Sequence, residues 1–385
     1  MTPALQLRRN LRVLILSASS GAGHVRAGQA LEKAFRSAGN CEVAHVDALQ
    51  YVSKLFQRIY DKAYIHMVNR APDLMGLLYQ QTDKPWSHPR ERLAMDRLNT
   101  QPMIRMLKRV QPDLCVATHF LPAEILAWLI ARKKLRARHV IAVTDFDVHA
   151  SWLCRTVDRY YLAIPESQEY LVRIGVPREK LRVAGIPIDP SFEESIGRDI
   201  ARMKFTLAPD AQVLLLSAGG YGVGPVEQLV MDLLRMGRPW QIVAIAGKSA
   251  PLKKRLDSLA KAADRTPSGQ TRLVAVGYTT EMDQYMAAAD LLIGKAGGLT
   301  TSEALARGLP MALVEPIPGQ EERNADHLLE AGAAIRCNNL PAAAWKIANL
   351  MDQPEKLAAM RLAACRMARP DAARSIAQDA LELLH

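Results

Sequence analysis

Residues 294–305 read GKAGGLTTSEAL and combine a lysine, two adjacent glycines and three hydroxyl side chains where a helical pattern begins. Gly297 and Gly298 would expose backbone amides, and the free N–H groups at the start of the next helix favour an anion such as a diphosphate. Glu303 follows in the first turn, close enough to hold a ribose diol. The pattern Thr300-x-x-Glu303 is also a capping box, in which the glutamate would bond its own helix. The stretch predicts a diphosphate site and leaves two roles open for Glu303.

A second polar stretch, PIPGQEERNA (316–325), follows the next expected strand. It places Gln320, Glu321 and Asn324 at the carboxyl end of that strand, beside the same cleft. One carboxylate and two amides are groups that hold sugar hydroxyls. We therefore expect these three side chains to bind a sugar.

Near the N-terminus, LILSASSGAGHVRAGQAL (14–31) reads as a strand, a Ser/Gly turn and a helix that begins near His24. This arrangement points backbone amides and the positive helix end into the cleft above the sheet. A dinucleotide fingerprint needs glycine where this chain has Arg26, and the GK[ST] of a phosphate-binding loop is absent. His24 could accept a proton from a hydroxyl at neutral pH, or it could simply cap the helix.

Asp145, Asp147 and His149 share one loop after another expected strand. Two carboxylates and a histidine raise the question of a metal site, but no second cluster completes a coordination shell, so we predict no metal. Asp145 could orient His24 or a substrate hydroxyl. Trp152 beside the loop would offer apolar surface to an acceptor.

The stretch LLLSAGGYGVGP (214–225) contains four glycines within six residues, starting with Gly219 and Gly220. Glycine lets a backbone approach a ligand closely. A plain flexible turn is the alternative, although the stretch follows a strand of buried type at the sheet edge where ligands bind.

Short apolar runs alternate with helix-length segments throughout, which is typical of parallel sheets covered by helices. Two series of expected strands form two doubly wound domains, with a break near 186–199. The first series is 11–17, 41–48, 114–120, 139–146, 159–165 and 181–187, and the second is 212–220, 240–247, 271–278, 289–298, 310–316 and 333–337.

Composition indicates the number of domains and the cellular compartment. The chain has 385 residues, 49% of them apolar, which is enough for two domains with cores. No apolar run approaches the roughly 20 residues of a membrane-spanning helix. The first ten residues, MTPALQLRRN, show no signal peptide, and the five cysteines form no CxxC pair. We expect a protein made and kept in a reducing cytosol.

The net charge of +11 is uneven, because residues 1–195 carry 28 Lys and Arg against 19 Asp and Glu. This suggests an anionic partner, either phospholipid headgroups or a phosphorylated substrate, although a solubility surface is the alternative. No nucleic-acid motif occurs, and we expect no nucleic-acid partner. The segment 49–98 mixes aromatic, apolar and basic residues at helical spacing. It could lie in a membrane interface with Trp86 near the headgroups, or pack on the domain core.

Taken together, these motifs resemble the family of processive diacylglycerol glycosyltransferases and monogalactosyldiacylglycerol synthases, in glycosyltransferase family 28. The peptidoglycan lipid-linked N-acetylglucosaminyltransferase is more distantly similar. The resemblance runs from about residue 11 to 335. It is carried by SGAGHVRAGQAL, TDFDVHASW with VDRYYLAIPE, GGYGVGP, and above all KAGGLTTSEALARGLP followed by PIPGQEERNA. Departures at Gly28, Ala218 and Ala296 exchange one small residue, or a proline, for another compact residue.

The resemblance implies an α/β fold of the type called GT-B, in which two doubly wound Rossmann-like domains enclose a cleft. Residues 1–195 would form the lipid-acceptor and membrane-association domain. Residues 196–365 would bind the UDP-sugar, and 366–385 would form a helix that crosses back to the first domain.

The resemblance also implies roles for individual residues, with His24 as the base or as part of the acceptor site. Together with the reading of the 145–149 loop, it leads us to expect His24 and Asp145 as the catalytic residues. The expected UDP-sugar site consists of Gly219, Gly220, Val276, Gly277, Tyr278, Lys295, Gly297, Gly298, Leu299, Thr300, Glu303, Gln320, Glu321 and Asn324, with uracil near 276–278, ribose on Glu303, diphosphate on 297–300 and the sugar on the last three. The expected acceptor side consists of Gly21, Gly23, His149 and Trp152.

The activity so implied is an inverting transfer of glucose or galactose from a UDP-sugar to diacylglycerol, giving a β-glycosyldiacylglycerol, with no metal or other cofactor. The protein would act at the anionic cytoplasmic face of the cell membrane as a peripheral protein. Three alternatives stay open: a polyprenyl-linked or glycolipid acceptor, a UDP-sugar epimerase of the same architecture, and a non-catalytic UDP-sugar or membrane binder.

Overall fold

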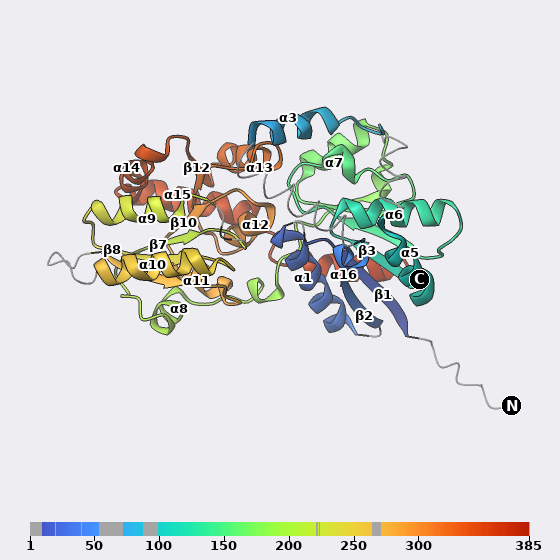
Figure 1. Ribbon diagram of the computed structural model, residues 1–385, viewed down its shortest axis with the longest axis horizontal. Helices are drawn as coiled ribbons and strands as arrows, with labels where there is room; N and C mark the ends of the chain where they lie inside the picture. The colour runs from blue at the N-terminus through green and yellow to red at the C-terminus, as the bar shows by residue number, and fades with distance from the viewer. Residues whose placement is uncertain are drawn as a thin grey trace, which may run out of the picture.

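The computed structural model describes residues 10–19, 21–39, 41–53, 72–87, 99–220, 222, 224–263 and 271–384. Figure 1 shows two lobes side by side, each built on a sheet with helices on both faces. Helix α1 (Ala22–Ala38) of one lobe faces helix α12 (Gly298–Ala306) of the other at the centre of the molecule. The cleft predicted from the sequence lies where these two helices begin.

The first sheet has six parallel strands in the order β2-β1-β3-β4-β5-β6. Its strands are β1 (Leu11–Ser17), β2 (Cys41–Asp47), β3 (Leu114–Ala117), β4 (Arg138–Ala142), β5 (Arg159–Leu162) and β6 (Leu181–Val183). The helices of this lobe are α1, α3 (Pro72–Thr82), α5 (Gln101–Val110), α6 (Phe120–Ala131) and α7 (Pro165–Arg173).

The second sheet also has six parallel strands, in the order β12-β11-β10-β7-β8-β9. Its strands are β7 (Gln212–Ser217), β8 (Trp240–Ile245), β9 (Arg272–Val276), β10 (Leu291–Gly294), β11 (Met311–Val314) and β12 (Ala334–Cys337). The helices are α8 (Arg198–Lys204), α9 (Val226–Arg235), α10 (Ala250–Ala263), α11 (Met282–Ala288), α12, α13 (Gln320–Glu330), α14 (Leu340–Met351) and α15 (Pro354–Met367). The predicted fold class of two doubly wound α/β domains is confirmed.

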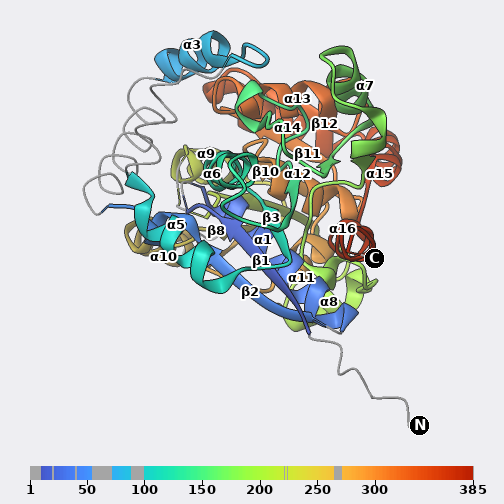
Figure 2. The same ribbon diagram turned by 90° about the vertical axis from the view of Figure 1, so that its right-hand side faces the viewer.

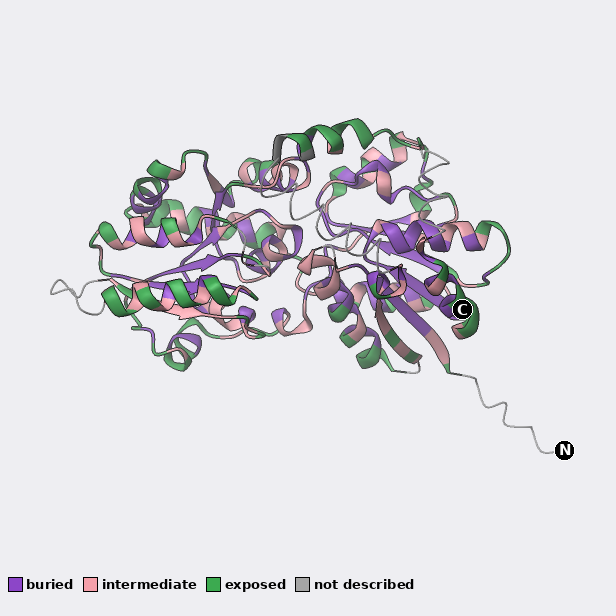
Figure 3. Ribbon diagram, viewed as in Figure 1, coloured by how far each residue is buried: buried purple, intermediate pink, exposed green. Residues whose placement is uncertain are grey.

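Burial explains why the central strands are apolar along most of their length rather than at alternate residues. A parallel sheet with helices on both faces buries both sets of side chains. In β1 the sequence LRVLILS is buried from Val13 to Ser17, and in β7 the sequence QVLLLS is buried from Val213 to Ser217. Figure 3 shows the two sheets as the buried layer, with exposed residues on the outer faces of the helices.

The last helix, α16 (Ala372–Glu382), belongs to the first lobe in space. It packs against α1, and its Ala373, Ile376 and Ala377 join the apolar core under β1. Asp379 accepts hydrogen bonds from Arg159 and from the Tyr161 hydroxyl, both on β5. The chain thus leaves the first lobe before α8 and returns to it after α15.

The amphipathic segment expected over 49–98 lies partly outside the described residues, which omit 54–71 and 88–98. Within it, α3 lies along the top of both lobes (Figures 1 and 2). The Trp86 ring donates a hydrogen bond to the carbonyl of Ile174 (2.8 Å) and packs, partly buried, against the core of the first lobe. Across the described part of the chain, every helix is too short or too polar to span a bilayer.

Candidate active site

Two connected cavities lie between the lobes, where α1 and α12 begin. Each helix starts after a glycine, Gly21 or Gly297, and neither has a side-chain cap among the described residues. The first cavity, of about 360 Å³, is lined by Gly21, Ala22, Gly23, His24, Arg26, Thr144, Asp145, Ser217, Ala218, Gly219, Gly220, Gly294, Lys295, Gly297, Gly298, Leu299, Thr300, Ile317, Gln320 and Glu321. Two positive helix ends therefore open into one space, which favours an anionic ligand.

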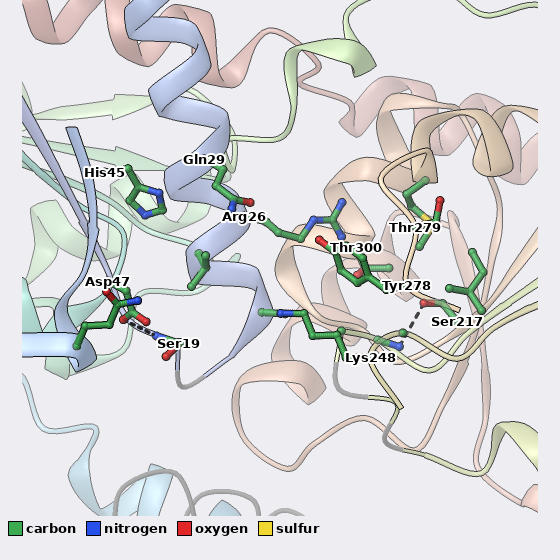
Figure 4. A pocket seen from close by; sticks show the side chains of 18 of the residues that line it. Ser19, Arg26, Gln29, His45, Asp47, Ser217, Lys248, Tyr278, Thr279 and Thr300 are labelled. Carbon is green, nitrogen blue, oxygen red and sulfur yellow. Dashed lines mark hydrogen bonds between the residues drawn. The ribbon is translucent and has the colours of Figure 1, made fainter. Parts of the chain in front are cut away.

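The second cavity, of about 510 Å³, lies on the other side of Arg26 and is shown in Figure 4. Its walls come from the end of β1 and from β2 on one side, and from the turns after β7, β8 and β9 on the other. The two cavities share Ala22, Arg26, Ser217, Gly219, Gly220 and Thr300. They are two parts of one interdomain cleft.

His24 lies in the first turn of α1 and lines the first cavity. Its Nδ1 atom is 2.9 Å from the carbonyl oxygen of Thr118 and 2.9 Å from the hydroxyl of Thr144. A carbonyl only accepts hydrogen bonds, so Nδ1 carries the proton and Nε2 holds the basic lone pair. Burial lowers the pKa of His24 to about 4, so the ring is neutral at physiological pH. This is the state that a general base requires.

Asp145 lines the same cavity but does not orient His24. Its Oδ1 accepts a hydrogen bond of 3.2 Å from Asn324, and the Nδ1 partners of His24 are Thr118 and Thr144 instead. Burial raises the pKa of Asp145 to about 6, with the charge of Asp147 adding to the effect. Of the two roles expected for Asp145, the geometry leaves contact with a substrate hydroxyl.

Asn324 differs from the sequence expectation, because it is fully buried and does not line either cavity. Its side-chain oxygen accepts from the amide of Phe146 (2.9 Å), and its amide group donates to Asp145 and to the carbonyl of Ala296 (3.0 Å). The first two partners belong to one lobe and the third to the other. Asn324 is therefore an interdomain brace, and its polar atoms are already occupied where a sugar hydroxyl was expected.

The glycines ahead of α12 serve two different purposes. A Cβ atom on Gly298 would lie 2.1 Å from the carbonyl oxygen of Thr144, so Gly298 allows the second lobe to touch the backbone of the first. A Cβ atom on Gly297 would meet only Glu321, at 3.6 Å. Lys295, which also lines this cavity, adds a positive charge beside the amides. An anion can thus approach the start of α12 through Gly297, while Gly298 holds the lobes together.

Gln320 and Glu321, in the first turn of α13, both line the first cavity as the sequence led us to expect. Glu321 accepts a hydrogen bond from the amide of Ile317 (2.8 Å), which fixes one of its carboxylate oxygens. Burial raises its pKa, and Lys295 nearby opposes that shift.

Glu303 does not make the capping contact considered for it from the sequence. Helix α12 begins at Gly298, so Glu303 lies in its second turn and does not cap it. Its Oε1 atom accepts a hydrogen bond from the guanidinium of Arg26 on α1, which forms an ion pair between the lobes. Burial raises the pKa of Glu303 to about 7, although Arg26 opposes the shift.

The expected uracil region is only partly on the cavity wall. Tyr278 lines the second cavity together with Thr279 and Met282, and the Lys248 ammonium lies 5.5 Å from the centre of the Tyr278 ring. Val276 and Gly277 do not line either cavity. Gly219 and Gly220 line both, which leaves the glycine turn after β7 on the wall.

On the expected acceptor side, Gly21 and Gly23 line the first cavity, but His149 and Trp152 do not. Trp152 is 3% exposed and packs in the first lobe, with its ring 6.3 Å from that of His24. The His149 ring holds the end of α3, since its Nε2 lies 3.0 Å from the carbonyl oxygen of Tyr79. Both side chains are buried, and neither contributes to the wall of either cavity.

Three cavity residues, Arg26, Thr144 and Lys248, were given no role from the sequence, and Thr118, which holds the His24 ring from outside the cavity wall, was given none either. Their partners lie far away in the chain, so no local pattern marks them. Among the described residues, no group of three or more His, Cys, Asp or Glu side chains is arranged to hold a metal ion.

Comparison with known proteins identifies the chain's relatives. A family model described as monogalactosyldiacylglycerol (MGDG) synthase matches residues 24–188, and one described as glycosyltransferase family 28 C-terminal domain matches residues 226–384. The processive diacylglycerol beta-glucosyltransferase of Bacillus cereus is 31% identical over 386 residues, which cover 98% of this chain and 95% of that protein. The protein of the same name from Staphylococcus saprophyticus is 29% identical over 381 residues, covering 98% and 94%.

Among solved structures, MurG of Acinetobacter baumannii superimposes with a TM-score of 0.65 at 16% identity, covering 97% of this chain and 100% of that one. At that identity the likeness supports the two-domain fold alone. The full-length match to the Bacillus cereus protein also supports membership of the same family. The chain belongs to the glycosyltransferase family of processive diacylglycerol glucosyltransferases and monogalactosyldiacylglycerol synthases, as its motifs predicted.

Proposed function

We propose that this enzyme transfers a hexose, with glucose the first candidate, from its UDP derivative to the free hydroxyl of diacylglycerol. The names of the full-length relatives support the donor and acceptor classes. One observation carries the proposal to the residues: His24 lines the same cavity as the uncapped start of α12 and Lys295. A base and an anion site thus face one space, which is what transfer from a sugar diphosphate to a hydroxyl needs.

In this reaction Nε2 of His24 accepts the proton of the acceptor hydroxyl while the hydroxyl oxygen bonds to the anomeric carbon. The bond from that carbon to the diphosphate oxygen breaks, and its electron pair leaves with UDP. Attack from the face opposite the leaving group converts an α-linked donor into a β-linked product. The α12 amides and Lys295 stabilise the charge that develops on the leaving diphosphate.

The low pKa of His24 suits this sequence of events. An imidazole with a pKa of about 4 does not hold a proton in the empty site. As negative charge develops on the diphosphate in the same cavity, that charge favours the imidazolium form. Proton transfer to His24 is therefore coupled to the departure of UDP. In the empty cleft, His24 stays unprotonated and available as a base.

We also propose that the protein docks on the anionic cytoplasmic face of the cell membrane through α3. Leu74, Leu77 and Leu78 on this helix are 50%, 51% and 40% exposed. The net positive charge of residues 1–195 supports attraction to anionic headgroups. Helix α3 lies against the turn before α13, since a Cβ on Gly76 would come within 2.9 Å of Pro318. Lipid at this helix would thus be adjacent to the sugar-binding end of the cleft.

One experiment separates the candidate functions. Purified enzyme is incubated with UDP-glucose or UDP-galactose and vesicles that contain diacylglycerol, and product mass and linkage are determined. We expect a β-linked monohexosyl product, unchanged after EDTA treatment because charge on the leaving group is met by Lys295 and amides. Reaction of the UDP-sugar without any acceptor would indicate an epimerase. Transfer only to a polyprenyl-linked acceptor would rule out diacylglycerol as the substrate.

A further inference from the structure

Arg26 and Glu303 form an ion pair that joins the two lobes beside the interdomain cleft. Arg26 comes from α1 of one lobe, and Glu303 comes from α12 of the other. The Glu303 side chain is 1% exposed, whereas that of Arg26 is 33% exposed. Glu303 lines neither cavity, while Arg26 lines both. Arg26 therefore separates the buried carboxylate from the open cleft.

The ion pair leaves Glu303 only half satisfied. Its Oε1 atom is bonded to Arg26, but its Oε2 atom is buried and has no hydrogen-bond partner within the described residues. A buried carboxylate oxygen without a donor is costly, and such atoms are uncommon in native structures. A hydroxyl-bearing ligand that reached Glu303 would supply the missing donor. The site is thus incomplete without a ligand.

The position of Arg26 also gives its guanidinium an alternative partner. Arg26 shares both cavities with Gly219, Gly220 and Thr300, which form the glycine turn and the start of α12. Figure 4 shows its side chain extending from α1 toward Thr300. A diphosphate at the start of α12 would lie within this shared region. The guanidinium matches a diphosphate as well as it matches a carboxylate, because both accept paired hydrogen bonds.

We propose that Arg26 is an exchangeable counter-ion: it covers Glu303 in the empty enzyme and moves to the diphosphate when UDP or the UDP-sugar binds. The hydroxyls of the ribose then take its place on Glu303. This inference rests on the proposed function, which places a UDP-sugar in the cleft. The exchange also affects the product UDP. Re-formation of the Arg26–Glu303 ion pair competes with bound UDP and assists its release.

The exchange predicts opposite effects on two ligands that differ only in the diphosphate. Uridine must displace Arg26 but offers it no new partner, whereas UDP displaces Arg26 and then binds it. In Arg26→Met, uridine should therefore bind at least threefold more tightly and UDP at least tenfold more weakly than in the wild type. Arg36→Met is the matched control, since Arg36 lies on the same helix and pairs with Glu32 at the surface. It should leave both affinities unchanged.

Calorimetric titration of uridine and UDP gives the dissociation constants, and circular dichroism checks the fold. Should Arg26→Met fail to fold, Arg26→Lys carries the same comparison with smaller shifts of the same two signs. In Glu303→Gln, the preference for uridine over 2′-deoxyuridine should fall. If the dissociation constants of uridine and UDP shift in the same direction, or do not shift, the exchange of Arg26 is overturned while the proposed function stays intact. A wild-type enzyme that binds no UDP would overturn both.

Discussion

The Nδ1 atom of His24 lies 2.9 Å from the carbonyl oxygen of Thr118, the residue that follows strand β3. In return, the Thr118 hydroxyl donates to the backbone carbonyl of His24 (2.9 Å). These two contacts fix the tautomer and the orientation of the ring without a carboxylate. The sheet itself positions the base, since Thr118 is held to β1 by a bond from its amide to the carbonyl of Leu16 (3.0 Å).

His24→Ala should abolish most transfer while leaving the donor site intact. Loss of a general base costs roughly 10²- to 10⁴-fold in rate, and His24 lies outside the set of groups expected to hold the nucleotide. The measurement is UDP release with diacylglycerol vesicles, together with the dissociation constant of UDP. A variant that keeps more than a tenth of the wild-type rate, with an unchanged UDP affinity, would remove His24 from the catalytic role.

His139 on β4 should make the protein sensitive to acid. Its ring is fully buried, both ring nitrogens lack a hydrogen-bond partner within the described part of the chain, and burial lowers its pKa to about 4. In the unfolded chain the His139 imidazole has a pKa near 6.5, so it takes up a proton there before it does so in the folded protein as the pH falls. The free energy of unfolding is therefore unaffected by the titration of His139 above about pH 6.5. It falls as the pH drops from there toward 4, by roughly 3 kcal/mol in total.

His139→Leu removes this proton uptake and fills a similar volume. Urea unfolding at pH 7 and at pH 4.5 should show that the wild type loses about 2 to 3 kcal/mol more than the variant over that interval. Equal losses in the two proteins would mean that His139 takes up no additional proton on unfolding, because the buried His24 and His119, whose pKa values are also lowered, act alike in both proteins.

Asn324→Ala distinguishes an interdomain brace from a sugar ligand. The change leaves the amide of Phe146 and the carbonyl of Ala296 buried without their partner, which costs about 2 to 4 kcal/mol of folding free energy. UDP-sugar affinity should change little, because Asn324 does not line the cavity. Asn349→Ala, at an exposed position of α14, is the control for stability. A variant of wild-type stability with weakened donor binding would favour the sugar-ligand role.

Much of this architecture was predictable, because each strand of a doubly wound fold is an apolar run that needs no distant information. All twelve expected strands are present, but several end early. The strand within 139–146 ends at Ala142 and its last bond to β5 comes from the amide of Val143, although Phe146 beyond it is buried. At the carboxyl ends of the strands, residues stay buried beyond the last hydrogen-bonded pair, because the loops there turn into the cleft. Apolar pattern alone does not distinguish a buried loop from a strand.

The site was less predictable, because its contacts join residues that are distant in sequence. Arg26 and Glu303 are 277 positions apart, and Asn324 reaches Phe146 across 178. The local pattern at Thr300 and Glu303 fitted a capping box, yet the helix begins two residues before Thr300 and the carboxylate pairs with the opposite lobe. Trp152 is recognisable in the sequence only as an aromatic residue beside a loop, and its burial follows from the packing of the first lobe.

Gly298→Ala should separate the lobes, whereas Gly297→Ala should not. The added Cβ at 298 would lie 2.1 Å from the Thr144 carbonyl, but at 297 its nearest neighbour is 3.6 Å away. Because a backbone atom cannot move aside as a side chain can, the contact between the lobes must open. Small-angle X-ray scattering should show a larger radius of gyration for Gly298→Ala alone, and its thermal midpoint should fall by several degrees. Identical scattering from both variants would contradict a close-packed interface at this glycine.

Replacement of Leu74, Leu77 and Leu78 by glutamine should weaken membrane binding while the protein stays folded. These side chains are 40% to 51% exposed, so each contributes about 1 kcal/mol or less to folding and about the same to insertion in an interface. The triple variant should bind vesicles of anionic phospholipid roughly tenfold or more weakly in a sedimentation assay. Leu362→Gln, at a position of α15 in the other lobe that is 61% exposed, is the control. Unaltered binding by the triple variant, with weakened binding at high salt, would show that basic residues alone hold the protein on the surface.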